Sequence, residues 1–328
     1  MAETTYRGAV ASAIAQEMER DPAVVLIGED VGVAGGVFKL TEGLFDRFGP
    51  ERVRDTPISE QAIVGAAMGA AMTGLRPIAE LMFSDFFAVT WDMVVNQIAK
   101  TRYMTDGQVS LPLVVQTPNG AGLRFGAQHS QSVENWMMAI PGLKVVAPSN
   151  PADVHGLMAA AIRDPDPVIV CQHKALLPTK GEVPDGEHVE PLGRAKVVRE
   201  GSDCTVVALA AMVPRALDAA ERLQADHGIS AEVIDLRCLV PLDVPTVLAS
   251  LEKTSRLFTV EENPRLGGWG AEVASLAADE GFWSLDAPIV RITTPHIPLP
   301  AAGVLEDLAV PSTDRIVETV RRGVDTRS

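Results

Sequence analysis

Apolar runs and amphipathic segments alternate along the chain in two blocks. In the first block, apolar runs of the kind that form buried strands lie at residues 24–28, 76–83, 111–117, 143–148 and 167–172. Segments with helical spacing lie at residues 61–73, 88–104 and 151–163, and the first twenty residues also have the pattern of an amphipathic helix. Strands that alternate with helices predict a parallel α/β sheet.

A second alternation begins after residues 174–193, which are rich in proline and glycine. Apolar runs recur at residues 204–210, 231–236, 256–262 and 288–293, with helical segments near 212–226, 243–253 and 270–281. The pattern therefore predicts an α/β protein of two domains, each with a mainly parallel sheet flanked by helices. We expect a first domain at residues 1–180, a linker at 181–193 and a second domain at 194–328.

The composition is that of a water-soluble globular protein, with 47 % hydrophobic and 22 % charged residues among 328. No apolar run reaches the roughly 18 residues that a membrane span needs. The first residues lack the basic and apolar segments of a targeting signal, so we expect a cytoplasmic protein without a membrane partner. A formal net charge of -15 disfavours nucleic acid as a partner.

Several familiar motifs are missing from the sequence. The glycine-rich segments 32–38 and 267–273 fit neither the dinucleotide-binding pattern nor a P-loop, so we interpret their glycines as turn and helix-entry residues. Three cysteines and six histidines show no zinc-ligand spacing. These patterns give no support to a nucleotide fold or a transition-metal enzyme.

Glu60 is the first candidate for chemistry. It lies in DTPISEQAIVGAAMGAAMTG, residues 55–74, near the start of a predicted helix whose small residues recur every three or four positions. Taken alone, the segment favours a structural interpretation, because a carboxylate at a helix N-terminus is stabilised by about 0.3–1 kcal/mol. A functional role needs support from the rest of the chain.

That support comes from seven segments, considered with their order and spacing. They are residues 56–86, 96–104, 117–131 (TPNGAGLRFGAQHSQ), 140–153 (IPGLKVVAPSNPAD), 160–170 (AAIRDPDPVIV), 234–243 (IDLRCLVPLD) and 260–272 (VEENPRLGGWGAE). Together they resemble the beta subunit of the decarboxylating first component of 2-oxo acid dehydrogenase complexes, in the transketolase-like thiamine-diphosphate family. The resemblance covers nearly the whole chain. It implies a pyrimidine-binding domain followed by a transketolase C-terminal-like domain.

The resemblance also implies roles for three side chains. Glu60 matches the glutamate that shares a proton with the aminopyrimidine ring of thiamine diphosphate. Phe86 matches the aromatic residue packed on that ring, although core packing is the ordinary role of such a phenylalanine. His129 matches a histidine that assists acyl transfer to a lipoyl group, and its glycine-rich loop suits a functional histidine.

A structural potassium site is a further implication of the resemblance. The turn in AAIRDPDPV would supply side chains and carbonyls, whereas a solvated turn is the alternative. The predicted ligands are Leu113, Ala161, Asp164 and Asp166. The chain also departs from the family after its His-Lys element, where relatives often carry a tyrosine and this sequence has Leu177 and Pro178.

The resemblance implies that the cofactor is shared with an alpha subunit in an alpha2-beta2 heterotetramer. The family holds the diphosphate through magnesium bound by Gly-Asp-Gly and a later asparagine, and Gly-Asp-Gly is absent from these 328 residues. We therefore expect the alpha subunit to hold the magnesium. A lipoyl acyltransferase core is the further expected partner, and the substrate is a 2-oxo acid or acetoin, with some motif details closer to acetoin-cleaving relatives.

Two other functions remain open from the sequence. Half of a transketolase or deoxyxylulose-phosphate synthase would use the same domains, although those enzymes are usually one long chain. A scaffold that has lost its chemistry would not need Glu60, Phe86 and His129 together.

Overall fold

The computed structural model describes residues 1–325, which form two compact units. Unit 1 consists of residues 1–120 and 136–192, and unit 2 of residues 121–135 and 193–328. The expected first domain, residues 1–180, includes the segment 121–135, whereas the structure groups this segment with unit 2. Its hydrogen bonds to unit 2, described below, explain why it groups with that unit.

Unit 1 contains a parallel sheet with its strands in the order β6-β7-β5-β4-β2-β3. The strands are β2 (Val24–Gly28), β3 (Val53–Asp55), β4 (Arg76–Glu80), β5 (Val114–Asn119), β6 (Lys144–Val146) and β7 (Val168–His173). Most of their residues are buried, because helices cover both faces of a parallel sheet. A separate antiparallel pair joins β1 (Ala2–Thr5) to β8 (Lys180–Val183). The expected linker thus begins inside an ordered strand.

Two of the three longer helices of unit 1, α1 (Tyr6–Arg20) and α7 (Pro151–Arg163), begin at a side-chain cap, whereas α3 (Glu60–Met72) has none. Thr5 accepts a hydrogen bond from the Gly8 amide at the start of α1, and Asn150 caps α7. The helical elements are α1, α2 (Leu44–Phe48), α3 (Glu60–Met72), η1 (Ser84–Phe86), α4 (Phe87–Asp92), η2 (Met93–Ile98), α5 (Thr101–Met104), α6 (Glu134–Met138), α7 and η3 (Lys174–Leu176). α6 crosses the boundary between the units.

The predicted continuous helix at residues 88–104 is wrong in detail. It is divided into α4, a π-helical segment η2 and the short α5. The Ala99 amide donates to the carbonyl of Val94, which is the wider spacing of a π-helix. A Cβ on Gly142 would lie 1.9 Å from the Ala99 carbonyl oxygen, so this end of the helix abuts a glycine loop. A periodicity argument cannot detect such an inserted residue.

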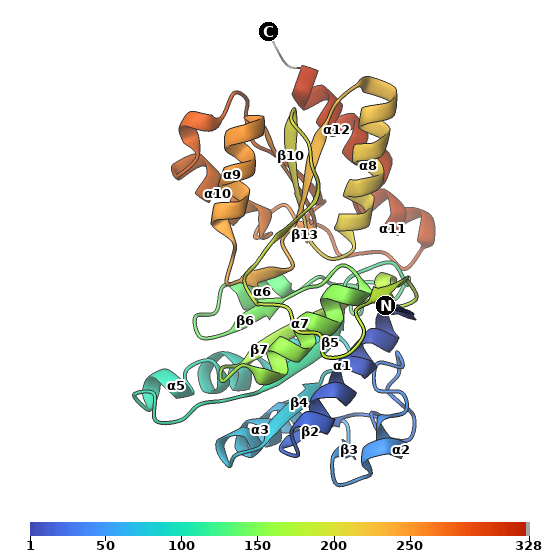
Figure 1. The fold of residues 1–328 in the computed structure, drawn as a ribbon, viewed down its shortest axis with the longest axis vertical. Coiled ribbons are helices and arrows are strands. Elements are labelled where there is room, and N and C mark those ends of the chain that lie inside the picture. Colours follow the sequence, from blue (N-terminus) through green and yellow to red (C-terminus); the bar gives the residue numbers. More distant parts are fainter. Residues whose placement is uncertain (326–328) are drawn as a thin grey trace. The chain divides into compact units, whose positions relative to one another are not determined.

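Unit 2 contains a five-stranded sheet in the order β14-β13-β10-β11-β9, in which only β9 is antiparallel to its neighbour. Figure 1 shows α9 and α10 on one side of β10 and β13, and α8 and α12 on the other. The strands of this sheet are β9 (Lys196–Arg199), β10 (Cys204–Ala208), β11 (Ala231–Asp235), β13 (Leu257–Pro264) and β14 (Val290–Thr294), and the short strand β12 (Cys238–Val240) is not part of it. The helical elements are α8 (Met212–His227), α9 (Val244–Thr254), α10 (Gly270–Asp279), η4 (Phe282–Ser284), α11 (Gly303–Ala309) and α12 (Thr313–Asp325).

The predicted α/β fold class is confirmed in both units, because parallel strands alternate with helices in each. Among the described residues, no helix is both long and apolar enough to span a bilayer.

Candidate active site

Glu60 is the first residue of α3 and directly follows the N-cap residue Ser59. The helix begins where the sequence predicted it. Only 9 % of Glu60 is exposed, although a carboxylate at a helix N-terminus needs no burial to interact with the free amides. Burial costs desolvation free energy, so this placement is more than a helix-stabilising device requires.

Glu29 lies next to β2, one residue beyond Gly28, and is also buried. Burial raises the pKa of the Glu29 carboxyl, and the charges of Glu60 and Asp30 raise it further. Two carboxyl groups that repel each other in a buried place favour a state in which one of them keeps a proton. Glu60 therefore has a second buried acidic group near it, and the protonated form of that group is favoured.

Glu80 ends β4 and is the start of a buried polar row across the sheet. The Gln116 amide donates to a Glu80 carboxylate oxygen at 2.6 Å, and Gln172 donates to the Gln116 carbonyl oxygen at 3.3 Å. Burial raises the pKa of Glu80 to about 7, and the hydrogen bond from Gln116 opposes that rise. A carboxyl with this pKa changes its protonation near neutrality.

Phe86 lies in the single turn η1, shortly after β4, and is half-buried. Its ring meets the ring of Phe83 edge to face with centroids 5.7 Å apart, and Phe83 meets Phe38 in the same way at 5.4 Å. The Lys174 ammonium lies 5.5 Å from the centroid of Phe83. Phe86, like Phe38, is a partly exposed member of this aromatic cluster, a position from which it can stack on a planar ligand.

These side chains share one edge of the unit 1 sheet. Gly28 pairs with Glu80, and Glu80 pairs with Gln116. Gly28 and Glu80 are the last residues of β2 and β4, and Gln116 lies in the middle of β5. Glu29 follows the first of these strand ends. Ligands of open parallel α/β sheets bind at the carboxyl ends of the strands. The sequence prediction missed Glu29 and Glu80. The available signals were an acidic residue directly after the apolar run 24–28 and an acidic residue within the run 76–83.

His129 belongs to unit 2 and lies in the loop 121–135. It is half-buried, and its amide donates to the Gly126 carbonyl at 3.4 Å. Gly122, Arg124 and Gly126 have positive φ angles, so the backbone of this loop takes conformations that favour glycine.

The predicted potassium ligands gather around the turn between α7 and β7. Leu111 donates to the Pro165 carbonyl at 3.1 Å, and Val168 donates to the Leu113 carbonyl at 2.9 Å. The Asp164 amide donates to the Ala161 carbonyl at 3.3 Å. Chain segments distant in sequence therefore bring carbonyl and carboxylate oxygens to one place.

Cationic side chains of unit 1 also occupy that turn. The Lys144 ammonium lies 2.6 Å from one Asp164 carboxylate oxygen and 3.4 Å from Asp166. Arg102 pairs with Asp166, and Arg76 donates to the Asp164 carbonyl at 3.0 Å. The turn attracts positive charge, and a bound ion would compete with Lys144.

The departure at Leu177 and Pro178 has a simple structural description. Leu177 is 5 % exposed, and its carbonyl accepts a hydrogen bond from the Arg7 amide at 3.3 Å. Pro178 is exposed. Leu177 is therefore part of the core of unit 1.

The glycines of the segment 267–273 are explained by packing within unit 2. A Cβ on Gly268 or Gly270 would lie 2.4–2.6 Å from the carboxylate of Glu261, to which the Gly270 amide donates at 2.8 Å. Arg291 pairs with the same carboxylate at 2.6 Å. The interpretation of these glycines as helix-entry residues is confirmed.

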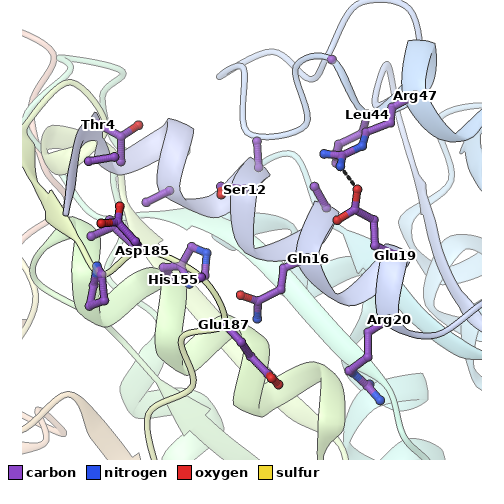
Figure 2. A pocket seen from close by; sticks show the side chains of 18 of the residues that line it. Thr4, Ser12, Gln16, Glu19, Arg20, Leu44, Arg47, His155, Asp185 and Glu187 are labelled. Carbon is purple, nitrogen blue, oxygen red and sulfur yellow. Dashed lines mark ion pairs between the residues drawn. The ribbon is translucent and has the colours of Figure 1, made fainter.

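A surface pocket of about 950 Å³ lies elsewhere in unit 1 and contains neither Glu60 nor Phe86. Figure 2 shows Ser12, Gln16 and Glu19 from α1 on one side and Arg47 beside Glu19. His155 lines the pocket and stacks on His188, with ring centroids 5.7 Å apart. Because many of its charged groups pair with one another, the pocket has little free charge for a ligand.

Comparison with known families gives two matches that together span most of the chain. The family described as "Transketolase, pyrimidine binding domain" matches residues 2–180, and "Transketolase, C-terminal domain" matches residues 193–316. A solved structure entitled "Split gene transketolase, inactive beta4 tetramer" has a TM-score of 0.79 and 25 % identity. It covers 98 % of this chain and 99 % of its own.

Individual relatives are more similar. The beta subunit of acetoin:2,6-dichlorophenolindophenol oxidoreductase from Bacillus subtilis is 50 % identical, over 94 % of each chain. The mitochondrial pyruvate dehydrogenase E1 component subunit beta-2 of Oryza sativa subsp. japonica is 47 % identical, over 98 % of this chain and 86 % of its own. The 2-oxoisovalerate dehydrogenase subunit beta of Bacillus subtilis is 45 % identical, over 98 % of each chain.

These similarities confirm the resemblance that the motifs indicated. The chain belongs to the family of beta subunits of pyruvate, acetoin and 2-oxoisovalerate dehydrogenases, which are built from transketolase-type pyrimidine-binding and C-terminal domains.

Proposed function

We propose that this chain is the beta subunit of a thiamine-diphosphate-dependent dehydrogenase first component. The enzyme decarboxylates a 2-oxo acid or cleaves acetoin and passes the acyl group to a lipoyl domain. The observation that carries the proposal is the buried Glu60 at the start of α3, next to Glu29 with its raised pKa. Such a pair suits proton exchange with a ring nitrogen, and the partly exposed Phe86 offers a surface for stacking.

When bound, thiamine diphosphate supplies the carbon nucleophile and the electron sink. Glu60 exchanges a proton with the aminopyrimidine nitrogen. Burial and the charge of Glu60 both favour the protonated form of the neighbouring Glu29. Phe86 orients the pyrimidine ring by packing on it.

Glu60→Gln tests this role in the enzyme reconstituted with its alpha subunit. We expect turnover to fall at least ~100-fold with the fold intact, the lower end for a positioned proton-transfer group. Glu51→Gln removes an exposed carboxylate of the same unit and is the matched control. Turnover of Glu60→Gln within a few-fold of the parent would refute the role.

For His129 the proposed role is assistance in acyl transfer. His129→Ala should slow acylation of a lipoyl domain more than decarboxylation measured with an artificial electron acceptor. Equal losses in the two half-reactions would remove the assignment.

The alpha subunit is proposed to hold the magnesium and the diphosphate. Support comes from the absence of Gly-Asp-Gly in this sequence and from the "subunit beta" names of the relatives. The solved split transketolase beta tetramer is called inactive in its own title. By calorimetry, this chain alone should show no metal-dependent binding of thiamine diphosphate, and the alpha-beta mixture should show it. Tight binding by the chain alone would overturn the proposal.

The proposed assembly is an alpha2-beta2 heterotetramer that docks on a lipoyl acyltransferase core. The net charge of -15 supports electrostatic steering toward a basic partner segment. Sedimentation of the alpha-beta mixture tests the stoichiometry. Docking that is equally strong at low and high ionic strength would contradict a charge-driven contact.

For the substrate, we propose that acetoin is turned over at least as well as pyruvate. The motif details AGLRFGAQHSQ and TPHIPLP support this choice, whereas identities of 50, 47 and 45 % to the three kinds of relative do not separate them. Dye-reduction assays with acetoin, pyruvate and branched-chain 2-oxo acids decide it. A clear preference for a branched-chain substrate would end the proposal.

We also propose that the turn between α7 and β7 binds potassium. The oxygens of Leu113, Ala161, Asp164 and Asp166 are donors of the kind that hard cations prefer. The Lys144 ammonium, 2.6 Å from the Asp164 carboxylate, would have to move away when potassium binds. The melting temperature of the chain should be higher in potassium chloride than in choline chloride at equal ionic strength. Equal melting temperatures would discard the site.

Half of a split transketolase is the second candidate. The solved split transketolase chain aligns over 99 % of its length, so chain length does not argue against this function. Its identity is 25 %, against 45–50 % for the dehydrogenase relatives. Transfer of a ketol group between sugar phosphates by the alpha-beta mixture, without 2-oxo acid or acetoin turnover, would favour this candidate.

A further inference from the structure

One carboxylate oxygen of unit 2 joins the two ends of the loop that carries His129. Glu262, in β13, accepts hydrogen bonds through Oε1 from the Ala121 amide at 2.6 Å and from the Ser132 hydroxyl at 2.6 Å. These two donors stand on either side of His129 in the sequence. Hydrogen bonds to a charged acceptor are stronger than those between neutral groups.

Neighbouring side chains add contacts at the same two ends. At the first end, Glu306 of α11 accepts from the Gly122 amide at 2.7 Å and from Arg124 at 3.0 Å. At the second end, the Asn263 amide group donates to the Ser132 carbonyl at 2.9 Å. Hydrogen bonds to the rest of unit 2 therefore hold the loop both before and after His129.

The side chains that hold the loop through these hydrogen bonds are buried in unit 2. Glu262 is 7 % exposed, Glu306 is 1 % exposed and Asn263 is fully buried. β13, which carries Glu262, is paired with β10 and with β14 through residues 258–260, shortly before Glu262. Polar groups on a rigid, buried strand hold a bound segment more closely than groups on a mobile surface do.

The loop needs such support because of its backbone. Arg124 has a φ of 64°, a conformation that side chains other than glycine adopt at a cost of about 1 kcal/mol or more. Gly122 and Gly126 also have positive φ angles and add flexibility to the unfolded loop. Without the contacts at its ends, this loop would sample many conformations.

We propose that Glu262 is a positioning residue for His129. It holds both ends of the loop 121–135 so that the imidazole is presented in one place during acyl transfer. This inference rests on the proposed function of His129. Glu262 itself takes no part in proton or acyl transfer.

Two substitutions of Glu262 separate positioning from charge. In Glu262→Gln, the side-chain carbonyl oxygen can still accept from both Ala121 and Ser132. In Glu262→Ala, neither hydrogen bond can form. The milder Ser132→Ala removes one of the two bonds and leaves the buried carboxylate in place. Glu252→Ala, which removes an exposed carboxylate of α9, is the matched control.

The experiment uses each variant reconstituted with the alpha subunit and measures both half-reactions. Acylation of a lipoyl domain should fall roughly 10- to 100-fold in Glu262→Ala, the cost of a misplaced group, while dye-coupled decarboxylation changes only a few-fold. Glu262→Gln and Glu252→Ala should keep the parent ratio of the two rates, and Ser132→Ala should be intermediate. Equal losses in both half-reactions, or an unchanged ratio in Glu262→Ala, would overturn the proposal.

Hydrogen exchange of residues 121–135, followed by mass spectrometry, gives a readout that does not depend on activity. Exchange should become faster in Glu262→Ala and stay at the parent rate in Glu262→Gln, and unchanged exchange in Glu262→Ala would also overturn the inference. The half-reactions of His129→Ala distinguish the two levels of the argument. If His129→Ala shows no selective loss, the proposed role of His129 fails; if it does and Glu262→Ala does not, only the positioning role fails.

Discussion

Replacing Glu80 by glutamine should reduce the dependence of unit 1 stability on pH. Glu80 is 5 % exposed, and burial raises its pKa from 4.5 to about 7. Between these values the folded chain still binds a proton that the unfolded chain has released. The stability that this proton contributes is fully present below pH 4.5 and is lost as the pH rises to about 7.

The size of the effect follows from the pKa. Each tenfold change in proton affinity corresponds to about 1.4 kcal/mol, so the full rise is worth about 3 kcal/mol. Most of this loss of stability develops between pH 5 and pH 8. Glutamine cannot ionise, and its carbonyl oxygen can still accept the hydrogen bond from Gln116. The variant should therefore gain about 2–3 kcal/mol relative to the parent between pH 5 and pH 8.

Urea unfolding of parent and variant at half-unit steps from pH 5 to 8 measures this difference. Other titrating groups contribute equally to both proteins and cancel in the comparison. Glu51→Gln, at an exposed glutamate, is the control for replacing a carboxyl by an amide elsewhere in unit 1. A difference between Glu80→Gln and the parent that stays constant over this range would refute the assignment of a raised pKa to Glu80.

Two further predictions concern packing and a buried histidine. Gly270→Ala should destabilise unit 2 by about 1–3 kcal/mol, because its Cβ would lie 2.6 Å from the Glu261 carboxylate. Gly69→Ala, on α3, should stabilise the chain by about 0.5–1 kcal/mol, because the added Cβ would meet no atom within 4 Å. Urea unfolding that shows the same change in stability for both variants would contradict these predictions. Burial lowers the pKa of His155, so the stability it contributes is present above pH 6.5 and is lost as the pH falls. In His155→Gln, the stability should fall less steeply below pH 6.5 than it does in the parent. An NMR titration midpoint of the His155 imidazole at or above 6.5 would contradict the prediction.

The sequence predicted best those elements whose pattern of apolar residues lies within one short segment of the chain. The run at residues 24–28 became β2 with the same bounds, and the helix at 151–163 became α7, because apolar spacing and the Asn150 cap are properties of a short segment. The pair β1 and β8 was not predicted. Ala2 pairs with Val183, and each strand is short and half-exposed, so neither has a pattern of its own.

The candidate site was predictable to the extent that its residues carry motifs. The position of Glu60 near a helix start could be predicted from Pro57 and Ser59, which precede the helical spacing of this segment. The raised pKa of Glu29 could not, because it depends on burial and on the charge of Glu60, which the fold brings near. Glu80 likewise acquires its pKa from the sheet that surrounds it.

The loop 121–135 shows why a domain boundary drawn from the sequence differed from the structure. Its neighbours in the chain, β5 before it and β6 after it, lie in the unit 1 sheet, so a linear division assigns the loop to the first domain. Its hydrogen bonds go instead to Glu262 and Glu306, more than 100 residues away, and no spacing rule connects such distant groups. Because the loop leaves one unit and is fixed by the other, His129 takes its position from unit 2 while Glu60 takes its position from unit 1. A substitution of Glu262 in β13 therefore acts directly on the loop that carries His129.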